Sequence, residues 1–297
     1  MKIGLGAPVS GAWATPDAIT HVATRAEELG YHSLWTFQRL LVGVDDRLDA
    51  VYQSVLDPLL PLGFAAATTT RIRLGVALVN LPYVSPVYLA KQAATLDVLS
   101  NGRFDLGLGV GWSATEFAAT GADTARRGAR AEEYVRVLRT LWTDDPASFD
   151  GEFYTVPPSR MLPRPVQPGG PPIILGGAVP AALRRAGRIA AGWMSRSATD
   201  LDRIADEIAV VRDAAPEPDR VRVVVRGVVR PGPRAGRLTG DYDDIRADAE
   251  WLGEQGVTEL YYDLNWHDRI GNPDVSPETA TSLAMEIIEA LAPGRSG

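Results

Sequence analysis

Residues 71–112 read RIRLGVALVNLPYVSPVYLAKQAATLDVLSNGRFDLGLGVGW, and this stretch predicts a strand, a helix and a second strand. Residues 72–78 and 104–108 are apolar runs of strand length, and residues 86–99 place apolar side chains at helical spacing. Ser85-Pro86 supplies an N-cap residue and a pre-set first helical position, and Asn101-Gly102 ends the helix. In such a unit the strands are parallel and the crossover between them is right-handed.

The carboxyl ends of these two strands are where we expect a ligand. In folds built on parallel strands, ligands bind beyond the carboxyl ends of the strands. The corresponding residues are Ala77–Tyr83 and Gly109–Glu116. The second segment begins Gly109-Val110-Gly111, and glycines let a ligand approach the backbone closely.

The same strand–helix alternation continues along the whole chain and favours a (β/α)8 TIM barrel, an α/β fold. Residues 1–297 then form one domain, with an irregular insertion rich in Pro and Gly at about 144–172, between the fourth and fifth strands. A doubly wound open sheet is the alternative, but it carries G-x-G-x-x-G after its first strand. Here the glycine run GLGVGW follows the fourth strand instead. The eight expected strands cover residues 2–6, 33–36, 72–78, 104–108, 173–175, 192–195, 221–229 and 259–264.

Composition excludes several classes of function. The net charge of −7 argues against nucleic acid or an anionic membrane as a partner. The chain has no cysteine, which excludes disulfides and thiolate metal sites, and no H-E-x-x-H spacing points to a metal. No apolar run reaches the roughly 18 residues of a membrane helix. The N-terminal residues MKIGLGAPVSG read as a strand rather than a signal peptide, so we expect a cytoplasmic protein.

Several motifs together resemble the bacterial luciferase-like flavin monooxygenase superfamily. The chain is most similar to the branch that depends on the deazaflavin coenzyme F420, although members that use flavin mononucleotide (FMN) share these motifs. The resemblance implies a TIM barrel, in agreement with the strand count. It also implies a homodimer, since many relatives pair through the outer helices of the barrel. The matching segments are GYHSLW (30–35), LGVALVNLPYVSPVYLAKQAATLDVLSNGRFDLGLGVGWSATEF (74–117), FDGEFYTVPPSRMLPRPVQPGGPPIILGG (149–177) and AGRIAAGWM (186–194).

The resemblance assigns the wall of a cofactor site to the third and fourth strands. It implies a bulge with a non-prolyl cis peptide at Ala77-Leu78, behind the isoalloxazine or deazaflavin ring, with Asn80 at the same strand end. An ordinary buried strand end is the alternative reading. We expect Trp112 to flank the ring and Thr115 to form a hydrogen bond with the cofactor, although Trp112 as a plug of the barrel mouth is also open.

A second glycine segment, Gly176-Gly177-Ala178, precedes a helix that begins at Pro180. Free N–H groups at a helix start attract anions, and in the resembling family this loop holds the cofactor phosphate. A tight turn is the alternative reading. We expect Ser195 and Arg196, after the sixth strand, to add a hydroxyl and a positive charge.

The second strand departs from the family pattern. Many F420-dependent relatives read Asp-His after Ser-Leu-Trp, but here the aligned residues are Gln38-Arg39. Arginine stays protonated and is no ordinary general acid, so Arg39 is a candidate for holding an anionic substrate or a cofactor carbonyl. The alternative is that Arg39 forms a surface salt bridge. His267 after the eighth strand and Tyr52 are the remaining candidates for proton transfer.

The leading hypothesis is an F420-dependent oxidoreductase that moves a hydride between the deazaflavin and a small organic substrate. One alternative is an FMN-dependent monooxygenase that receives reduced flavin from a separate reductase. Another is a barrel that binds a ligand without catalysis, which the missing Asp-His pair leaves open. We expect Trp13, Phe37, Trp112 and Trp266 to line the barrel mouth and exclude water there.

Overall fold

A closed barrel of parallel strands forms the centre of the computed structural model, which describes residues 1–294. The barrel confirms the expected fold, and its strands follow the order β1-β2-β3-β4-β7-β8-β9-β12. All eight expected strand positions are occupied within the described residues; residues 295–297 of the expected domain lie outside them. The barrel strands are β1 (Lys2–Gly6), β2 (Ser33–Thr36), β3 (Arg73–Asn80), β4 (Phe104–Gly109), β7 (Ile173–Gly176), β8 (Gly192–Met194), β9 (Arg222–Val228) and β12 (Glu259–Asp263).

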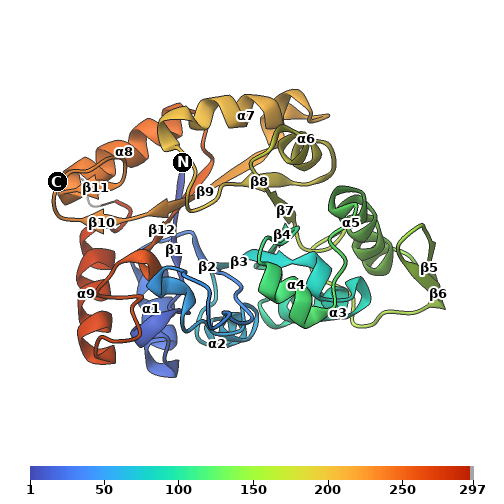
Figure 1. Ribbon diagram of the computed structural model, residues 1–297, viewed down its shortest axis with the longest axis horizontal. Coiled ribbons are helices and arrows are strands. Elements are labelled where there is room, and N and C mark those ends of the chain that lie inside the picture. The colour runs from blue at the N-terminus through green and yellow to red at the C-terminus, as the bar shows by residue number, and fades with distance from the viewer. Residues whose placement is uncertain (295–297) are drawn as a thin grey trace.

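Helices surround the barrel, and their starts follow simple capping rules (Figure 1). Proline occupies the first position of four of them, where its missing N–H costs no hydrogen bond. Asp241 and Asp244 form a reciprocal capping box at the start of α8. The helices are α1 (Pro16–Glu28), α2 (Leu60–Thr68), α3 (Pro86–Leu99), α4 (Ala114–Thr120), α5 (Arg127–Thr143), α6 (Pro180–Ile189), α7 (Ile204–Asp213), α8 (Tyr242–Glu254) and α9 (Pro277–Ala290).

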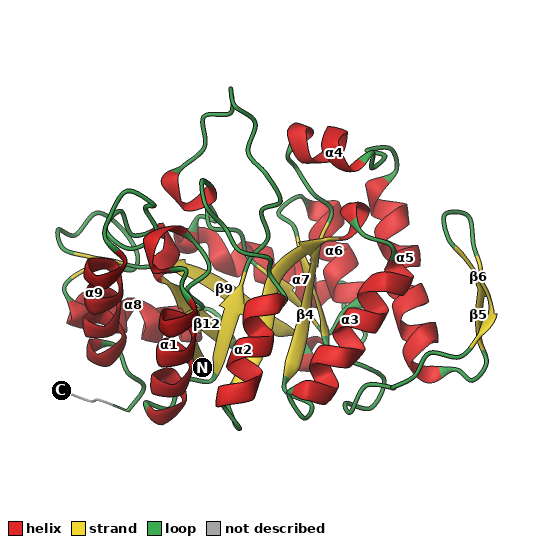
Figure 2. Cartoon of the chain, turned by 90° about the horizontal axis from the view of Figure 1, so that it is seen from below, coloured by secondary structure: helices red, strands yellow, loops and turns green. Residues whose placement is uncertain are grey.

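Two of these segments differ from expectation. The seven-residue helix α4 is an addition to the strand–helix alternation, because it precedes the barrel helix α5. It lies between Ser113, whose hydroxyl accepts the N–H of Glu116, and Gly121 in the left-handed conformation. Figure 2 shows α4 apart from the layer of barrel helices, toward one end of the strands. Ser85 does stand at the N-cap position of α3, but its side chain makes no capping hydrogen bond.

The expected irregular insertion at 144–172 contains an antiparallel hairpin, so the prediction of irregular structure was wrong for this part. Its strands are β5 (Ala147–Asp150) and β6 (Thr155–Ser159). The physical reason is a buried carboxylate: Glu133 of α5 accepts the N–H groups of three turn residues, Glu152, Phe153 and Tyr154. The hairpin lies at the edge of the molecule, outside α5 (Figure 1).

The inside of the barrel is filled in two layers. Near the amino ends of the strands, Arg222 joins Asp105 and Glu259 at 2.8 and 3.0 Å, and Arg73 reaches Asp105 at 2.7 Å. Glu259 also accepts hydrogen bonds from Ser33 and from the indole of Trp35. Above this ionic floor lies a small apolar layer that ends beneath the barrel mouth, made by Trp35, Ala77, Ile174, Met194, Val224 and Tyr261.

The remaining small strands, β10 (Arg230–Pro231) and β11 (Thr239–Gly240), pair in the connection between β9 and α8. Within the described residues, no helix combines the length and the low polarity that are needed to cross a bilayer.

Candidate functional site

A pocket of about 360 Å³ opens at the carboxyl ends of the barrel strands. This volume lies within the usual range of small-molecule sites, about 300–1,000 Å³. It contains many of the residues that the sequence predicted for the site. Its walls are Phe37, Gln38, Arg39, Tyr52, Ala77, Leu78, Asn80, Trp112, Gly177, Met194, Ser195, Arg196, Ser197, Ala198, Arg226 and Tyr261.

The end of β3 forms one wall, and it has the expected irregular backbone. The peptide bond between Ala77 and Leu78 is cis, and the pairing of β3 with β4 shifts register between Val76 and Val79. The expected bulge with a non-prolyl cis peptide is therefore confirmed. Ala77, Leu78 and Asn80 all line the pocket.

Glycines on neighbouring strands make room for the side chain of Leu78. A Cβ atom at Gly176 of β7 would lie 2.2 Å from Leu78 Cδ1, and one at Gly107 of β4 would lie 2.9 Å from Cδ2. Both distances are too short for real atoms, so only glycine lets Leu78 lie there. Gly176 therefore shapes the wall without lining the pocket, whereas Gly177, the next residue, lines it.

The end of β2 is tied to the wall at two points. Gln38 accepts the N–H of Asn80 through its side-chain oxygen at 2.8 Å, which joins the loop after β2 to the end of β3. Glu116 of α4 accepts the N–H of Leu40 at 2.7 Å and lies 3.1 Å from Arg39 Nη1. Arg39 is buried, so the alternative of a surface salt bridge was wrong.

Aromatic rings stack on the guanidinium of Arg39. Its central carbon lies 4.7 Å from the ring centre of Tyr52 and 4.5 Å from that of Trp112. Tyr52 in turn meets Phe37 edge to face. The side chain of Trp112 is 59% exposed, so it forms the rim of the pocket and does not plug the barrel.

Arg226 on β9 is a site residue that the sequence analysis missed. Its guanidinium lies 4.9 Å from the ring centre of Phe37, and its Nε lies 2.9 Å from Asp263 Oδ2. Its backbone N–H donates to the hydroxyl of Ser195. Burial by itself lowers the pKa of Arg226, but Tyr261 and Asp263 outweigh burial and raise it, so the group stays charged. The sequence did contain a signal for Arg226: it is a charged residue within the apolar, β-branched run VRVVVRGVV (221–229), and a charge is rarely buried without a partner.

Besides Gly176, five expected residues do not line the pocket. His267 follows the last barrel strand, where its Nδ1 accepts the N–H of Arg269, and burial lowers the pKa of its imidazole. Thr115 donates to Asp46 on the exposed outer side of α4. Trp13 is fully buried and donates to Asn265, and Trp266 packs edge to face on Tyr52 from outside the pocket. Ala178 also lies outside the lining.

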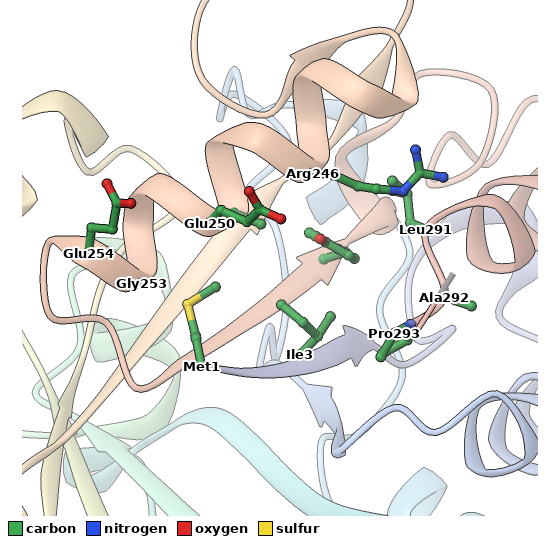
Figure 3. A pocket seen from close by; sticks show the side chains of 12 residues that line it. Met1, Ile3, Arg246, Glu250, Gly253, Glu254, Leu291, Ala292 and Pro293 are labelled. Atoms are coloured by element: carbon green, nitrogen blue, oxygen red, sulfur yellow. The ribbon is translucent and has the colours of Figure 1, made fainter. Parts of the chain in front are cut away.

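A larger hollow of about 810 Å³ lies elsewhere, between α8 and residues 291–294 (Figure 3). Met1 and Ile3 line it, so it adjoins the amino end of β1. Because the loops that follow the strands are at the other end of the barrel, this hollow lacks the cis-peptide wall and the aromatic rim. The pocket at the strand ends remains the candidate site.

Relatives in sequence share much of the chain. An uncharacterised protein from Mycobacterium tuberculosis is 34% identical over 250 residues, which cover 84% of this chain and 79% of that protein. The F420-dependent glucose-6-phosphate dehydrogenase of Amycolatopsis mediterranei is 28% identical over 212 residues, covering 70% of this chain and 61% of the enzyme.

Solved structures share the fold. The monooxygenase RslO1 from Streptomyces bottropensis has a TM-score of 0.81 at 23% identity, and each chain is covered completely. An F420-dependent secondary alcohol dehydrogenase, solved with an F420-acetone adduct, has a TM-score of 0.75 at 18% identity, with 98% of each chain covered. At these identities the likeness shows the fold alone. The family model described as luciferase-like monooxygenase matches residues 3–274, and the chain therefore belongs to the luciferase-like monooxygenase family.

Proposed function

We propose that this chain is an F420-dependent oxidoreductase that transfers a hydride between the deazaflavin and a small organic substrate. The observation that carries the proposal is the pocket at the carboxyl ends of the strands, where Ala77 and Leu78 at the bulged end of β3 share a lining with Gly177, Ser195 and Arg196. Family membership limits the expected cofactors to F420 and FMN. The similarity to F420-dependent glucose-6-phosphate dehydrogenases supports the deazaflavin.

The residues present fit such a cofactor. Leu78 presents an apolar surface against which a planar ring can lie, held in place because Gly107 and Gly176 leave room behind it. Gly177, next to the start of α6, and Arg196, in the loop after β8, line the same pocket and suit a phosphate. Among the described residues that line the pocket, three are arginines and none is acidic, which favours an anionic ligand.

Different residues of the pocket would exclude water, transfer a proton and orient the substrate. When bound, the deazaflavin supplies a hydride to a substrate carbon or accepts one from it. Trp112 at the rim and Met194 below restrict water, which protects such a transfer. Tyr52 lines the pocket, and we assign to its hydroxyl the proton that accompanies the hydride. Arg39 holds a polar group of the substrate or the ring in place through its donors.

Titration of the purified protein with F420 and with FMN tests the proposal. Trp112 is exposed at the rim, so a bound ring quenches tryptophan emission, and Trp112→Phe should lose most of this change. We expect tighter binding of oxidised F420 than of FMN. Tighter binding of FMN, together with oxygen-dependent turnover once a separate reductase supplies reduced flavin, would replace the proposal with a monooxygenase. Tight binding of either cofactor without turnover of any substrate would favour a binding protein.

The proposal includes a second copy of the chain as a partner, which rests on the family resemblance. We expect the 31.9 kDa chain to sediment at about twice its mass in sedimentation equilibrium. A monomer mass at every concentration would contradict this part alone.

A further inference from the structure

Two arginines line the same pocket, and each is held in the same way. Arg39 follows β2 and is stacked on Tyr52 and Trp112, while Arg226 on β9 is stacked on Phe37 and Tyr261. Phe37 and Tyr52 meet edge to face at 6.3 Å, so the two stacks join into one continuous wall. All six residues line the pocket.

Each arginine forms an ion pair with a carboxylate outside the pocket lining. Each ion pair engages one nitrogen of its guanidinium. Glu116 lies 3.1 Å from Arg39, and Asp263 lies 2.9 Å from Arg226. Neither carboxylate lines the pocket. Arg39 Nη1 and Arg226 Nε are taken up by these two ion pairs, whereas Arg39 Nε is buried with no hydrogen-bond partner within residues 1–294. Buried donors without partners are costly, and a ligand that satisfies them removes that cost.

We propose that the substrate of this site carries a carboxylate, which Arg39 and Arg226 recognise; this inference rests on the proposed function. Arginine matches the planar carboxylate with two parallel donors, which gives both charge and shape selectivity. The paired carboxylates offset the charge of each arginine, so what remains in the pocket is a set of oriented donors inside an aromatic wall. The substrate is therefore an organic acid with an apolar body that packs on the rings.

Benzoate and benzamide form a matched pair of probes, because they share a shape and differ in the charged group. We expect the apoprotein to bind benzoate at least tenfold more tightly than benzamide, measured by tryptophan emission and by ligand-observed NMR. Equal affinity for the two probes would overturn the inference with the wild-type protein alone, whatever the variants do.

Variants locate the binding. Arg39→Lys and Arg226→Lys keep the charge beside Glu116 and Asp263 but lose the two-donor geometry, and each should weaken benzoate binding at least tenfold. Arg196→Lys and Arg220→Lys are controls, since Arg196 lies on the side assigned to phosphate and Arg220 is 80% exposed; both should bind benzoate like the wild type. Loss of binding only in Arg196→Lys would place the carboxylate in the phosphate region and overturn the inference.

A parallel titration with F420 separates this inference from the proposed function. If benzoate is preferred but neither F420 nor FMN binds, the carboxylate site stands and the oxidoreductase proposal fails. If F420 binds while benzoate and benzamide bind equally, the oxidoreductase proposal stands and the carboxylate site is wrong.

Discussion

Arg39 Nη1 lies 3.1 Å from Glu116 Oε2, and both side chains are almost completely buried where the loop after β2 meets α4. Glu116 also accepts the N–H of Leu40, so one carboxylate fixes both the side chain and the backbone of this loop. At Gln38-Arg39, the residues aligned with the Asp-His pair of many F420-dependent relatives, this ion pair thus fixes a guanidinium in place. The stability of the loop and the position of Arg39 depend on the same carboxylate.

Replacing Glu116 should destabilise the fold strongly. Glu116→Gln keeps an acceptor for Leu40 but leaves the buried guanidinium of Arg39 without a counter-charge, which costs about 3 kcal/mol of the free energy of unfolding. Urea denaturation measures the difference. The matched control is Asp206→Asn, which breaks the exposed pair with Arg203 and should cost less than about 1 kcal/mol. Equal effects of the two changes would contradict the structural role of Glu116.

Tyr52 and His267 make opposite predictions for proton transfer. Tyr52→Phe keeps the ring that stacks on Arg39 and removes the hydroxyl, so turnover should fall about 100-fold while cofactor affinity stays the same. His267→Gln should leave turnover and its pH profile unchanged, because His267 does not line the pocket. Steady-state kinetics from pH 5 to 9 compare the two variants. A loss of the pH dependence in His267→Gln would restore the histidine as the proton carrier.

Gly177 should tolerate no side chain. It has φ = 150°, and a Cβ atom there would lie 2.5 Å from Ala182 Cβ, at the start of α6. Gly177→Ala should lower cofactor affinity at least tenfold, as read by fluorescence titration, and cost about 1–3 kcal/mol of stability. Gly63→Ala is the control, since no atom lies within 4 Å of an added Cβ in α2. That change should leave cofactor binding intact and stabilise the helix by about 0.5–1 kcal/mol.

Asp105 in the barrel floor should make stability fall in acid. Burial by itself raises the pKa of Asp105, but Arg73 and Arg222 outweigh burial and hold the pKa below its usual range. The stabilisation is therefore complete above the unfolded-state pKa, about 3.9, and is lost as the pH falls through the lower folded-state value. Urea denaturation from pH 7 to pH 3 should show Asp105→Asn less stable than wild type at pH 7, with the difference shrinking below about pH 4. A difference independent of pH would contradict the assigned charge, and Asp243→Asn, at a 90% exposed carboxylate, is the control.

Local signals account for the parts of the fold that the sequence predicted well. Pro86 begins α3 as expected, and Asn101 and Gly102 adopt the positive φ angles that end a helix. Each barrel strand is a short apolar run between such signals. The hairpin at 147–159 was hidden because its order depends on Glu133, a residue of another element that no local pattern connects with it.

The site shows the same division. The cis peptide at Ala77-Leu78 was predictable because the resemblance placed it within a matched motif. Arg226 was not, since its role depends on Phe37 and Asp263, which lie on other strands or loops and meet it only when the barrel closes. The prediction for Trp13 was wrong. Its position after β1 suggested that it lines the barrel mouth, but its indole N–H donates to Asn265 in the buried interior.

The ionic floor of the barrel has a consequence for kinetics. Asp105, Arg222 and Glu259 close the amino end, and Trp35 stacks on Tyr261 just above them. Within the part of the chain that the structure describes, ligands therefore enter and leave the pocket at the rim by Trp112. When two molecules stack in a pocket that is closed at one end, the deeper one must bind first and dissociate last. We expect the cofactor to occupy the inner position and to bind before the substrate. Initial-rate kinetics and product inhibition measure this order of binding.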